Sequence, residues 1–326
     1  MPVAVHILRS HAWLHDELLS QGATPPAGYV LAESRRTADV LVYLEPPWRD
    51  ATAAERLTTL RPRDLARAVV YSQNDLPIPW APGLYASLPA SRAGRGFAGA
   101  FYVMPHHREG APLPYELELA RERTPDLLWS FSGTVRNAPV RQRLMELVDP
   151  RATVRDTSYF SDVVRWGWDS SHSAEAIRGF KEYAGDLGRA AFVVCPRGRG
   201  TGSVRLFEAM QAGRCPVIVS DDWLAPPLVD WGSCSLRVAE DDVARLPELL
   251  RDAEPQAEEL GREARRLWEQ HFRPERRVAT LVAGAGAQAA AVSLRDRVAL
   301  CARAQLLPNT LVRARRSVRT RLARRS

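Results

Sequence analysis

Short apolar runs alternate with amphipathic stretches along the first 120 residues of this 326-residue chain. Four runs have the length and composition of buried strands, at residues 3–8, 38–44, 69–72 and 98–104. Helical periodicity follows the first run at residues 11–19, and residues 55–68 also have helical character despite Pro62. Strands that alternate with helices predict a mostly parallel sheet. Residues 74–89 contain four prolines, which predicts an irregular surface loop.

The same alternation returns after residue 126. Apolar runs predict strands at residues 127–131, 190–195, 215–220 and 234–238, and periodic stretches predict helices at 141–148, 180–187, 204–212, 242–250 and 254–270. A proline-rich and then charged connector at residues 108–126 separates the two halves. We therefore predict an N-terminal domain over 1–120, a second domain over 121–290, and a basic helical tail over 291–326. Both domains are α/β.

The charge of the chain lies mainly in its tail. The formal net charge is +7, but residues 292–326 hold ten arginines and one aspartate, so the 291 residues before them sum to −2. A near-neutral body argues against nucleic acid as a partner, because such proteins present a basic face. Apolar positions in the tail fall on one helical face, which predicts contact of residues 308–326 with an anionic membrane. A disordered terminus and a helix packed across the domains are the alternatives.

Cysteine and lysine usage restrict the interpretation further. The four cysteines have no metal-ligand spacing and lie mostly in apolar runs, which is typical of buried thiols in a reducing compartment. The N-terminal residues lack a secretion signal, and no segment approaches the ~20 apolar residues that span a bilayer. We expect a cytoplasmic protein, or one associated with the inner face of the membrane. Lys181 is the only lysine, so arginine is the default cation and a single arginine carries little information.

One stretch combines a strand, a glycine loop, a helix and a second strand, over residues 190–220. The loop carries Gly198, Gly200 and Gly202, and Ser203 is placed to cap the helix that follows. Glycines let the backbone approach a ligand, and a helix N-terminus offers free N–H groups to an anion. This unit predicts a site for a diphosphate.

Charged side chains stand where such a site needs them. Thr201, Arg205 and Glu208 share one face of the predicted helix, with Arg205 in its first turn beside the glycine loop. A guanidinium there can bind phosphate through two hydrogen bonds, and Glu208 can accept hydrogen bonds from ribose hydroxyls. Arg136 follows a strand and Gly133, which aims a second cation at the same place. The alternatives are a weak Arg205–Glu208 surface ion pair and a solvated loop arginine at 136.

The glycine loop also approximates a dinucleotide fingerprint. Gly198 and Gly200 fit its first two positions, Ser203 replaces the third glycine, and Asp221 stands near the offset of a ribose-binding acid. An NAD(P)-dependent oxidoreductase therefore stays open as an alternative. A P-loop is excluded, because no Gly-Lys-Ser/Thr follows. Asp221 and Asp222 do not form an Asp-x-Asp motif, and we expect no metal.

The span from about 127 to 250 resembles the exostosin family of glycosyltransferases, family GT47. The motifs that carry the resemblance are Phe131-Ser132-Gly133-x-x-Arg136, Phe192-x-x-Cys195-Pro196-x-Gly198, Ser203-x-Arg205-Leu206-x-Glu208-Ala209, Gly213-x-Cys215-Pro216-Val217-Ile218-x-Ser220-Asp221, and Asp230-Trp231. They stand in the right order over some 120 residues. The N-terminal half matches only loosely. Animal and plant members usually carry a membrane anchor, and its absence here suggests a compact, bacterial-type enzyme.

The resemblance implies a GT-B fold, in which two Rossmann-like domains face a central cleft. It also implies inverting transfer of a sugar from a nucleotide sugar, usually a UDP-sugar, without a cofactor or an obligatory metal. By position, Arg136 and Arg205 would contact the diphosphate and Glu208 the ribose or nucleotide, while the loop after Pro196 closes over the phosphates. The implied donor-binding residues are Gly133, Arg136, Pro196, Arg197, Gly198, Thr201, Gly202, Ser203, Arg205 and Glu208.

Inverting transfer needs a base that takes a proton from the acceptor hydroxyl. In a GT-B fold this base would come from the N-terminal domain, near the carboxyl ends of its strands. Glu45, Asp75 and His106 meet this condition, although each could equally be a turn or capping residue. The acceptor could be a saccharide, a small molecule or a lipid-linked molecule. A non-catalytic nucleotide-sugar-binding module remains a further alternative.

Overall fold

The computed structural model describes residues 1–20, 24–45, 61–104, 107, 111–158 and 174–306. The chain divides into two compact units. Unit 1 combines Met1–Phe101 and Leu224–Pro226 with the segment from Glu275 onward, and unit 2 combines Tyr102–Trp223 with Pro227–Pro274. The division differs from the predicted boundaries at 120 and 290. Helix α4 (Pro112–Arg121) packs against α7 (Ala174–Arg189) of unit 2, and helix α11 (Pro274–Ala290) packs within unit 1.

Unit 1 is built on a six-stranded sheet in the order β2-β1-β3-β4-β5-β6. Every pair of neighbouring strands is parallel, as the sequence predicts. The strands are β1 (Val3–Leu8), β2 (Tyr29–Leu31), β3 (Val40–Glu45), β4 (Ala68–Ser72), β5 (Gly83–Tyr85) and β6 (Phe97–Gly99). Strands β3 and β4 are buried along their whole length, which explains their continuous apolar runs. Of the strand predicted at 98–104, only residues 98 and 99 pair with a neighbouring strand, as part of β6.

The proline-rich stretch at 74–89 is not the surface loop that its composition predicts. It contains β5, and its side chains Ile78, Trp80 and Leu88 are buried in the core of unit 1. Local hydrogen bonds satisfy its irregular backbone: Asn74 Oδ1 accepts from the Leu76 N–H at 3.0 Å, and the Tyr85 hydroxyl donates to the Ala81 carbonyl at 2.7 Å. Because these partners are internal, the stretch can be buried without a regular ladder.

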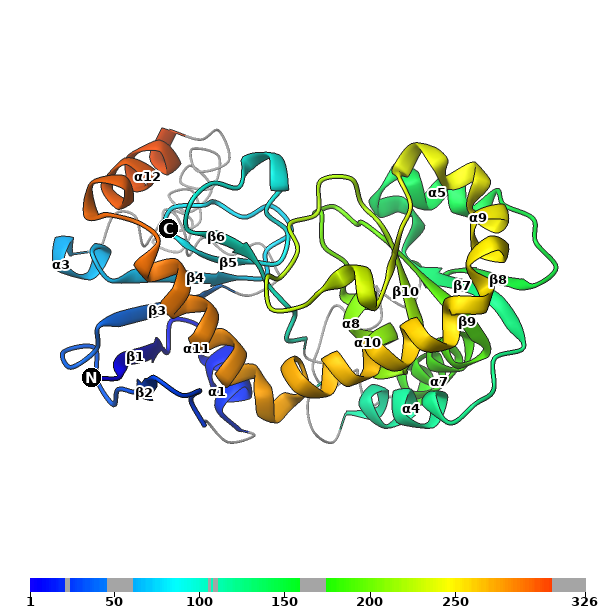
Figure 1. Cartoon of the computed structure of the whole chain (residues 1–326), viewed down its shortest axis with the longest axis horizontal. Coiled ribbons are helices and arrows are strands. Elements are labelled where there is room, and N and C mark those ends of the chain that lie inside the picture. The colour runs from blue at the N-terminus through cyan, green and yellow to red at the C-terminus, as the bar shows by residue number, and fades with distance from the viewer. Residues whose placement is uncertain (21–23, 46–60, 105–106, 108–110, 159–173, 307–326) are drawn as a thin grey trace, which may run out of the picture. The chain divides into compact units, whose positions relative to one another are not determined.

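The α-helices that the structure describes in unit 1 are α1 (Ala12–Ser20), α3 (Pro62–Leu65), α11 and α12 (Leu294–Leu306) (Figure 1). Gly284 of α11 faces the Leu84 side chain of β5, where a Cβ would come within 3.0 Å of it. In α12, Arg297 is buried and donates to the carbonyls of Ala68 and, at 2.7 Å, of Ala289. The predicted tail segment 308–326 lies outside the described residues.

No single helix of the described residues is long and apolar enough to cross a membrane. The pair Pro274–Ala290 and Leu294–Arg303 reaches that length and composition only when taken together, and the two are bent by 101°.

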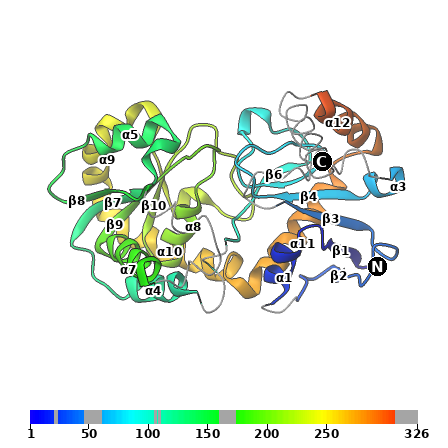
Figure 2. The same cartoon turned by 180° about the vertical axis from the view of Figure 1, so that it is seen from behind.

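Unit 2 contains a five-stranded parallel sheet in the order β11-β10-β9-β7-β8 (Figures 1 and 2). The strands are β7 (Leu127–Gly133), β8 (Ala152–Asp156), β9 (Ala190–Pro196), β10 (Cys215–Val219) and β11 (Leu236–Arg237). Helices α5 (Pro139–Met145) and α9 (Leu246–Ala253) pack into the apolar core around β7, β9 and β10. Helices α7, α8 (Val204–Gln211) and α10 (Ala257–His271) also pack against the sheet. Trp231 is a core residue, stacked with Phe272.

Both units are thus Rossmann-like α/β units, and the predicted fold class is confirmed at this level. The arrangement of the two units about a central cleft stays a prediction. The positions that matter for function are those at the carboxyl ends of the strands, where parallel α/β sheets bind their ligands.

Candidate functional site

The order of the strands in unit 2 marks one place where a ligand is expected. Strand β7 lies between β8 and β9, so the chain runs from β7 to one side and then returns to the other. The carboxyl ends of β7 and β9 therefore flank a topological switch point, where the connections that leave the two strands diverge. The ten predicted donor-binding residues lie at the ends of these two strands or just after them: Gly133 ends β7 and Arg136 follows it, and Pro196 ends β9 and the others follow it up to residue 208.

The loop after β9 leads directly into the first turn of α8. Ser203 precedes the helix in an extended conformation, but its side chain makes no capping hydrogen bond. Its Oγ is buried and has no partner among the described residues, and the whole residue is 8% exposed. The first N–H groups of a helix have no acceptor within the helix. The start of α8 thus combines an unpaired buried hydroxyl with free backbone donors, which is the chemistry that binds a phosphate.

Arg205, in the first turn of α8, is buried rather than spread over the surface. It is 9% exposed, and its guanidinium lies 5.0 Å from the centre of the Phe131 ring and 5.9 Å from that of Tyr183. Its Nη2 donates to the Ser132 carbonyl of β7, while its Nε has no partner in the described part of the chain. Aromatic faces hold a guanidinium in place. Arg205 is therefore held against β7, and its Nε–H is unpaired in the described part of the chain.

Gly133 makes this position of Arg205 possible. A Cβ at residue 133 would overlap the Nη2 of Arg205 and lie 3.2 Å from its central guanidinium carbon. Any larger residue at the end of β7 would push the guanidinium out of its place. The glycine is thus needed for the close approach of a side chain, a role that its place in the motif does not reveal.

Glu208 is held by two partners that the sequence analysis did not identify. It is 5% exposed, its Oε1 lies 2.8 Å from His107 Nε2, and its Oε2 accepts from the Tyr183 hydroxyl. Burial first, and then the negative charge of Glu208, raise the pKa of Tyr183 well above its usual value, so the phenol stays neutral and donates. Glu208 and Arg205 are both buried, which excludes an ion pair at the surface.

Arg141 joins the loops on either side of the switch point, and it too was missed. Its guanidinium donates to three carbonyls: Nη1 to Thr134 at 3.0 Å, Nη2 to Pro196 at 3.1 Å, and Nε to Arg197 at 2.9 Å. The side chain is almost completely buried and lies over the Phe131 ring at 5.9 Å. These three bonds fix the end of β9 against the end of β7, so the glycine loop leaves the sheet in a defined direction.

The other two arginines of the predicted site lie further out. Arg136 is exposed on the 3₁₀ turn Val135–Asn137. Burial raises the pKa of Asp156, but hydrogen bonds from Ser158 and the Val135 N–H, and then the positive charge of Arg136, lower that pKa below its usual value. Arg197 is half-buried and its Nε donates to Glu240 Oε1 at 2.7 Å. Arg136 is the more accessible of these two cations for a ligand.

Asp221 has a structural task in this region. Its Oδ1 accepts from the Glu240 N–H at 3.0 Å, which ties the end of β10 to the turn that follows β11. Its exposure leaves the carboxylate accessible, but this bond explains its presence without a ribose. The Asp221 signal for a dinucleotide therefore weakens.

The candidate bases are in unit 1. Glu45 ends β3, which stands beside β1 and β4 at the switch point of that sheet, and its Oε1 accepts from the Trp80 indole N–H at 2.9 Å. It is 3% exposed. Asp75 follows β4 in the next stretch and is half-buried. His106 lies outside the described residues. Glu45 and Asp75 thus occupy the carboxyl edge of the sheet as expected, and their catalytic role stays a prediction.

Comparison with known proteins identifies the same region. Residues 98–253 match the sequence model of the Exostosin GT47 domain. The chain is 37% identical over 95 residues to the Exostosin-1 homolog of Caenorhabditis elegans. The alignment covers 28% of this chain and 25% of that protein. It is also 44% identical over 70 residues to a probable glucuronosyltransferase of Oryza sativa subsp. japonica. That alignment covers 21% of this chain and 17% of the rice protein. The predicted resemblance to exostosin-like GT47 glycosyltransferases is therefore confirmed.

The extent of these matches is limited. The chain spans about a quarter or less of the length of these curated relatives. Among solved structures, Anabaena HepE in complex with UDP aligns with 90% of this chain and 100% of its own, at 9% identity and a TM-score of 0.39. A TM-score of this size supports no argument about the fold, so the fold assignment rests on the two parallel sheets.

Proposed function

We propose that this protein transfers a sugar from a nucleotide-sugar donor, a UDP-sugar, to a hydroxyl group of an acceptor, with inversion at the anomeric carbon. The observation that carries the proposal is the place of the predicted donor residues. All ten lie inside the GT47 match, and all end or follow β7 or β9 at the switch point of unit 2. The acceptor class we propose is a saccharide, a small molecule or a lipid-linked molecule.

The diphosphate of the donor would lie at the start of α8. Backbone N–H groups and the Ser203 hydroxyl offer neutral donors there, and Arg205 offers a fixed positive charge. Arg136 would reach the same group from the loop after β7. Because negative charge develops on the leaving diphosphate, donors that are already in place lower the barrier without further reorganisation. This is the catalytic contribution that the described residues can make.

Glu208 is suited to hold the ribose. Its Oε2 accepts a hydrogen bond from the Tyr183 hydroxyl, and its Oε1 lies 2.8 Å from His107 Nε2. An ionised carboxylate accepts hydrogen bonds, and the hydroxyl groups of a ribose donate them. The two protein partners fix the carboxylate in one orientation, which is what a specific sugar contact requires.

The proton of the acceptor hydroxyl would pass to a base in unit 1. Glu45, Asp75 and His106 are the candidates, and the proposal does not need a metal ion for this step. Cytoplasmic localisation and contact of residues 308–326 with an anionic membrane are further parts of the proposal. They rest on the cysteine pattern and on the composition of the tail. Removal of residues 308–326 should reduce co-sedimentation with anionic vesicles and leave nucleotide binding unchanged.

Two other functions make different predictions. An NAD(P)-dependent oxidoreductase would bind NADH, and a non-catalytic module would bind UDP without ever releasing it from a UDP-sugar. The involvement of Asp221 in a backbone contact with Glu240 favours neither of them over transfer.

Calorimetric titration with UDP, GDP and NADH, in buffer that contains EDTA, tests the donor site. We expect UDP to bind, NADH not to bind, and Arg205→Ala to weaken UDP binding about tenfold or more, the loss of a hydrogen bond to a charged group. Arg266→Ala is the matched control, because Arg266 is an exposed arginine of unit 2 that pairs with Glu263 on α10. UDP release from UDP-sugars with acceptor extracts then separates a transferase from a binding module. Binding of NADH in place of UDP would refute the proposal.

A further inference from the structure

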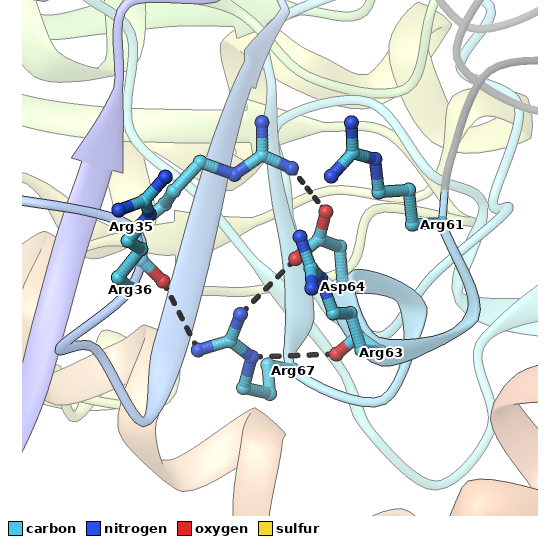
Figure 3. A pocket seen from close by; sticks show the side chains of 6 residues that line it. All are labelled: Arg35, Arg36, Arg61, Arg63, Asp64 and Arg67. Atoms are coloured by element: carbon cyan, nitrogen blue, oxygen red, sulfur yellow. Dashed lines mark hydrogen bonds and ion pairs between the residues drawn. The ribbon is translucent and has the colours of Figure 1, made fainter.

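Five arginines surround one aspartate in unit 1, at the end of the sheet opposite to the carboxyl ends of its strands (Figure 3). Arg35 and Arg36 precede β3, and Arg61, Arg63, Asp64 and Arg67 precede β4. Because β3 and β4 are parallel neighbours, both segments stand at the amino ends of the strands. Together they line a pocket of about 470 Å³, which lies within the usual range for small-ligand sites.

Asp64 and Arg67 form the fixed part of this pocket. Asp64 is 1% exposed, and its two oxygens accept from Arg35 and, at 3.0 Å, from Arg67 Nη2. Arg67 also donates to the backbone, with Nη1 on the Arg35 carbonyl at 3.1 Å and Nε on the Arg63 carbonyl at 3.3 Å. One buried carboxylate thus orders two guanidinium groups, and the backbone bonds of Arg67 tie the two segments together.

The remaining guanidinium groups are available. Arg36, Arg61 and Arg63 are exposed, and their side chains make no hydrogen bond or ion pair with any residue that the structure describes. Five guanidinium groups against one carboxylate give the described lining residues a net charge of +4. Like charges in one concavity repel one another, so an anion bound among them would be stabilised by every one of them. The high arginine content of the chain does not account for this convergence.

We propose that this pocket binds a phosphate-type anion with two or more negative charges, such as a diphosphate group. A guanidinium presents its N–H groups in a planar fork that matches phosphate oxygens. A single carboxylate offers two oxygens, whereas a diphosphate offers enough oxygens for several forks at once. All six described lining residues are charged, so the described part of the pocket offers no aromatic or apolar side chain to a base or an acyl chain. The pocket recognises the anion itself, whether the group is free in solution or carried by a lipid.

This site is separate from the catalytic edge of its own sheet. The six residues of β3 run from the pocket to Glu45, and at about 3.3 Å a residue they place the two edges roughly 20 Å apart. The anion bound here would not be the one whose bond is broken. Binding at this place would instead position or recruit a second phosphorylated molecule.

Titration with inorganic diphosphate in the presence of saturating UDP tests the pocket, because UDP occupies the donor site. The variant Arg36→Ala with Arg63→Ala removes two exposed guanidinium groups that have no partner among the described residues, so the fold should be retained. The control is Arg92→Ala with Arg95→Ala, two exposed arginines of unit 1 outside the pocket. We expect the pocket variant to bind diphosphate at least tenfold more weakly, and the control to bind like the wild type. Equal affinity of the two double variants would overturn the proposal.

Vesicles identify the source of the anion. Both double variants are compared for co-sedimentation with phosphatidic acid vesicles after removal of residues 308–326, so that the basic tail does not contribute. Selective loss in the pocket variant supports a lipid-carried phosphate, and equal binding together with selective loss of diphosphate binding supports a free one. If the wild type binds neither diphosphate nor these vesicles, the pocket is not an anion site. Added salt should weaken binding, because the interaction is between charges.

Discussion

Substitution of Gly133 by alanine is the sharpest probe of the proposed donor site. The new Cβ would overlap the Nη2 of Arg205, and the guanidinium would have to leave its place between Phe131 and Tyr183. The substitution changes no charge and removes no side chain. It therefore tests the position of Arg205 and not merely its presence.

The size of the effect follows from the contacts that Arg205 would lose. Its hydrogen bond to the Ser132 carbonyl is worth about 1.5–3 kcal/mol, as for other bonds to charged groups. The contact with the Phe131 ring adds about 0.5–2 kcal/mol. Because the displaced guanidinium regains water, we expect roughly 1–3 kcal/mol of lost stability in unit 2. If Arg205 binds the diphosphate, a loss of about 1.5–3 kcal/mol there weakens UDP binding some tenfold to 100-fold.

The assay is a thermal melt together with calorimetric titration of UDP. Gly185→Ala is the control: Gly185 lies within α7, a Cβ there meets its nearest atom only at 3.8 Å, and alanine favours a helix by about 0.5–1 kcal/mol. We expect the control to melt no lower than the wild type and to bind UDP equally well. A Gly133→Ala protein that melts lower but binds UDP normally would refute the reasoning, because Arg205 would then support β7 and not the nucleotide.

Two further predictions concern the surroundings of this site. Tyr183→Phe removes the hydroxyl that donates to Glu208, and should weaken UDP binding about three- to tenfold, the usual worth of one hydrogen bond, in a titration at pH 7.5; unchanged affinity would show that Glu208 does not need this support. Burial raises the pKa of Cys195 and Cys234 to about 12, and that of Cys215 also above its usual value, so less than about one thiol in a thousand is ionised at pH 8. With a thiol reagent at pH 8, we expect only the half-exposed Cys301 to react quickly in the folded protein, and the other three thiols to react after unfolding. Equal reaction rates for all four thiols in the folded protein would contradict the burial of those three.

The strands whose bounds the sequence predicted most closely are long ones that lie away from the edges of a sheet. Strands β3, β7 and β9 are buried nearly throughout, so their apolar runs are continuous and easy to recognise. Strands β2 and β5 have three residues each, and β8 is only half-buried. Such segments become strands because a neighbour pairs with them, and their own sequence does not require it. Helix α4 was overlooked for a related reason, since its prolines lie in the first turn, where they are tolerated.

The candidate site shows a similar limit. Arg205 and Glu208 could be predicted because they stand close to the glycine loop in sequence, on one helical face. The residues that hold them could not: His107 is 101 positions from Glu208, and Arg141 is 55 from the Pro196 carbonyl. Contacts of this separation follow from the fold and leave no local periodicity. The one signal was the pair of histidines after Pro105: His106 is the predicted base, and His107 is the histidine that lies against Glu208.

The division of unit 1 between the two ends of the chain has a consequence for biosynthesis. Its sheet comes from residues 1–101, but α11 and α12 complete its packing, through Gly284 on Leu84 and Arg297 on the Ala68 carbonyl. Unit 2 is nearly continuous, so all of its residues leave the ribosome before these two helices exist. Domains usually fold from the N-terminus as they are synthesised. Here we expect the reverse order: unit 2 can reach its final fold first, and Leu84 in the nascent sheet of unit 1 stays uncovered until α11 has been synthesised.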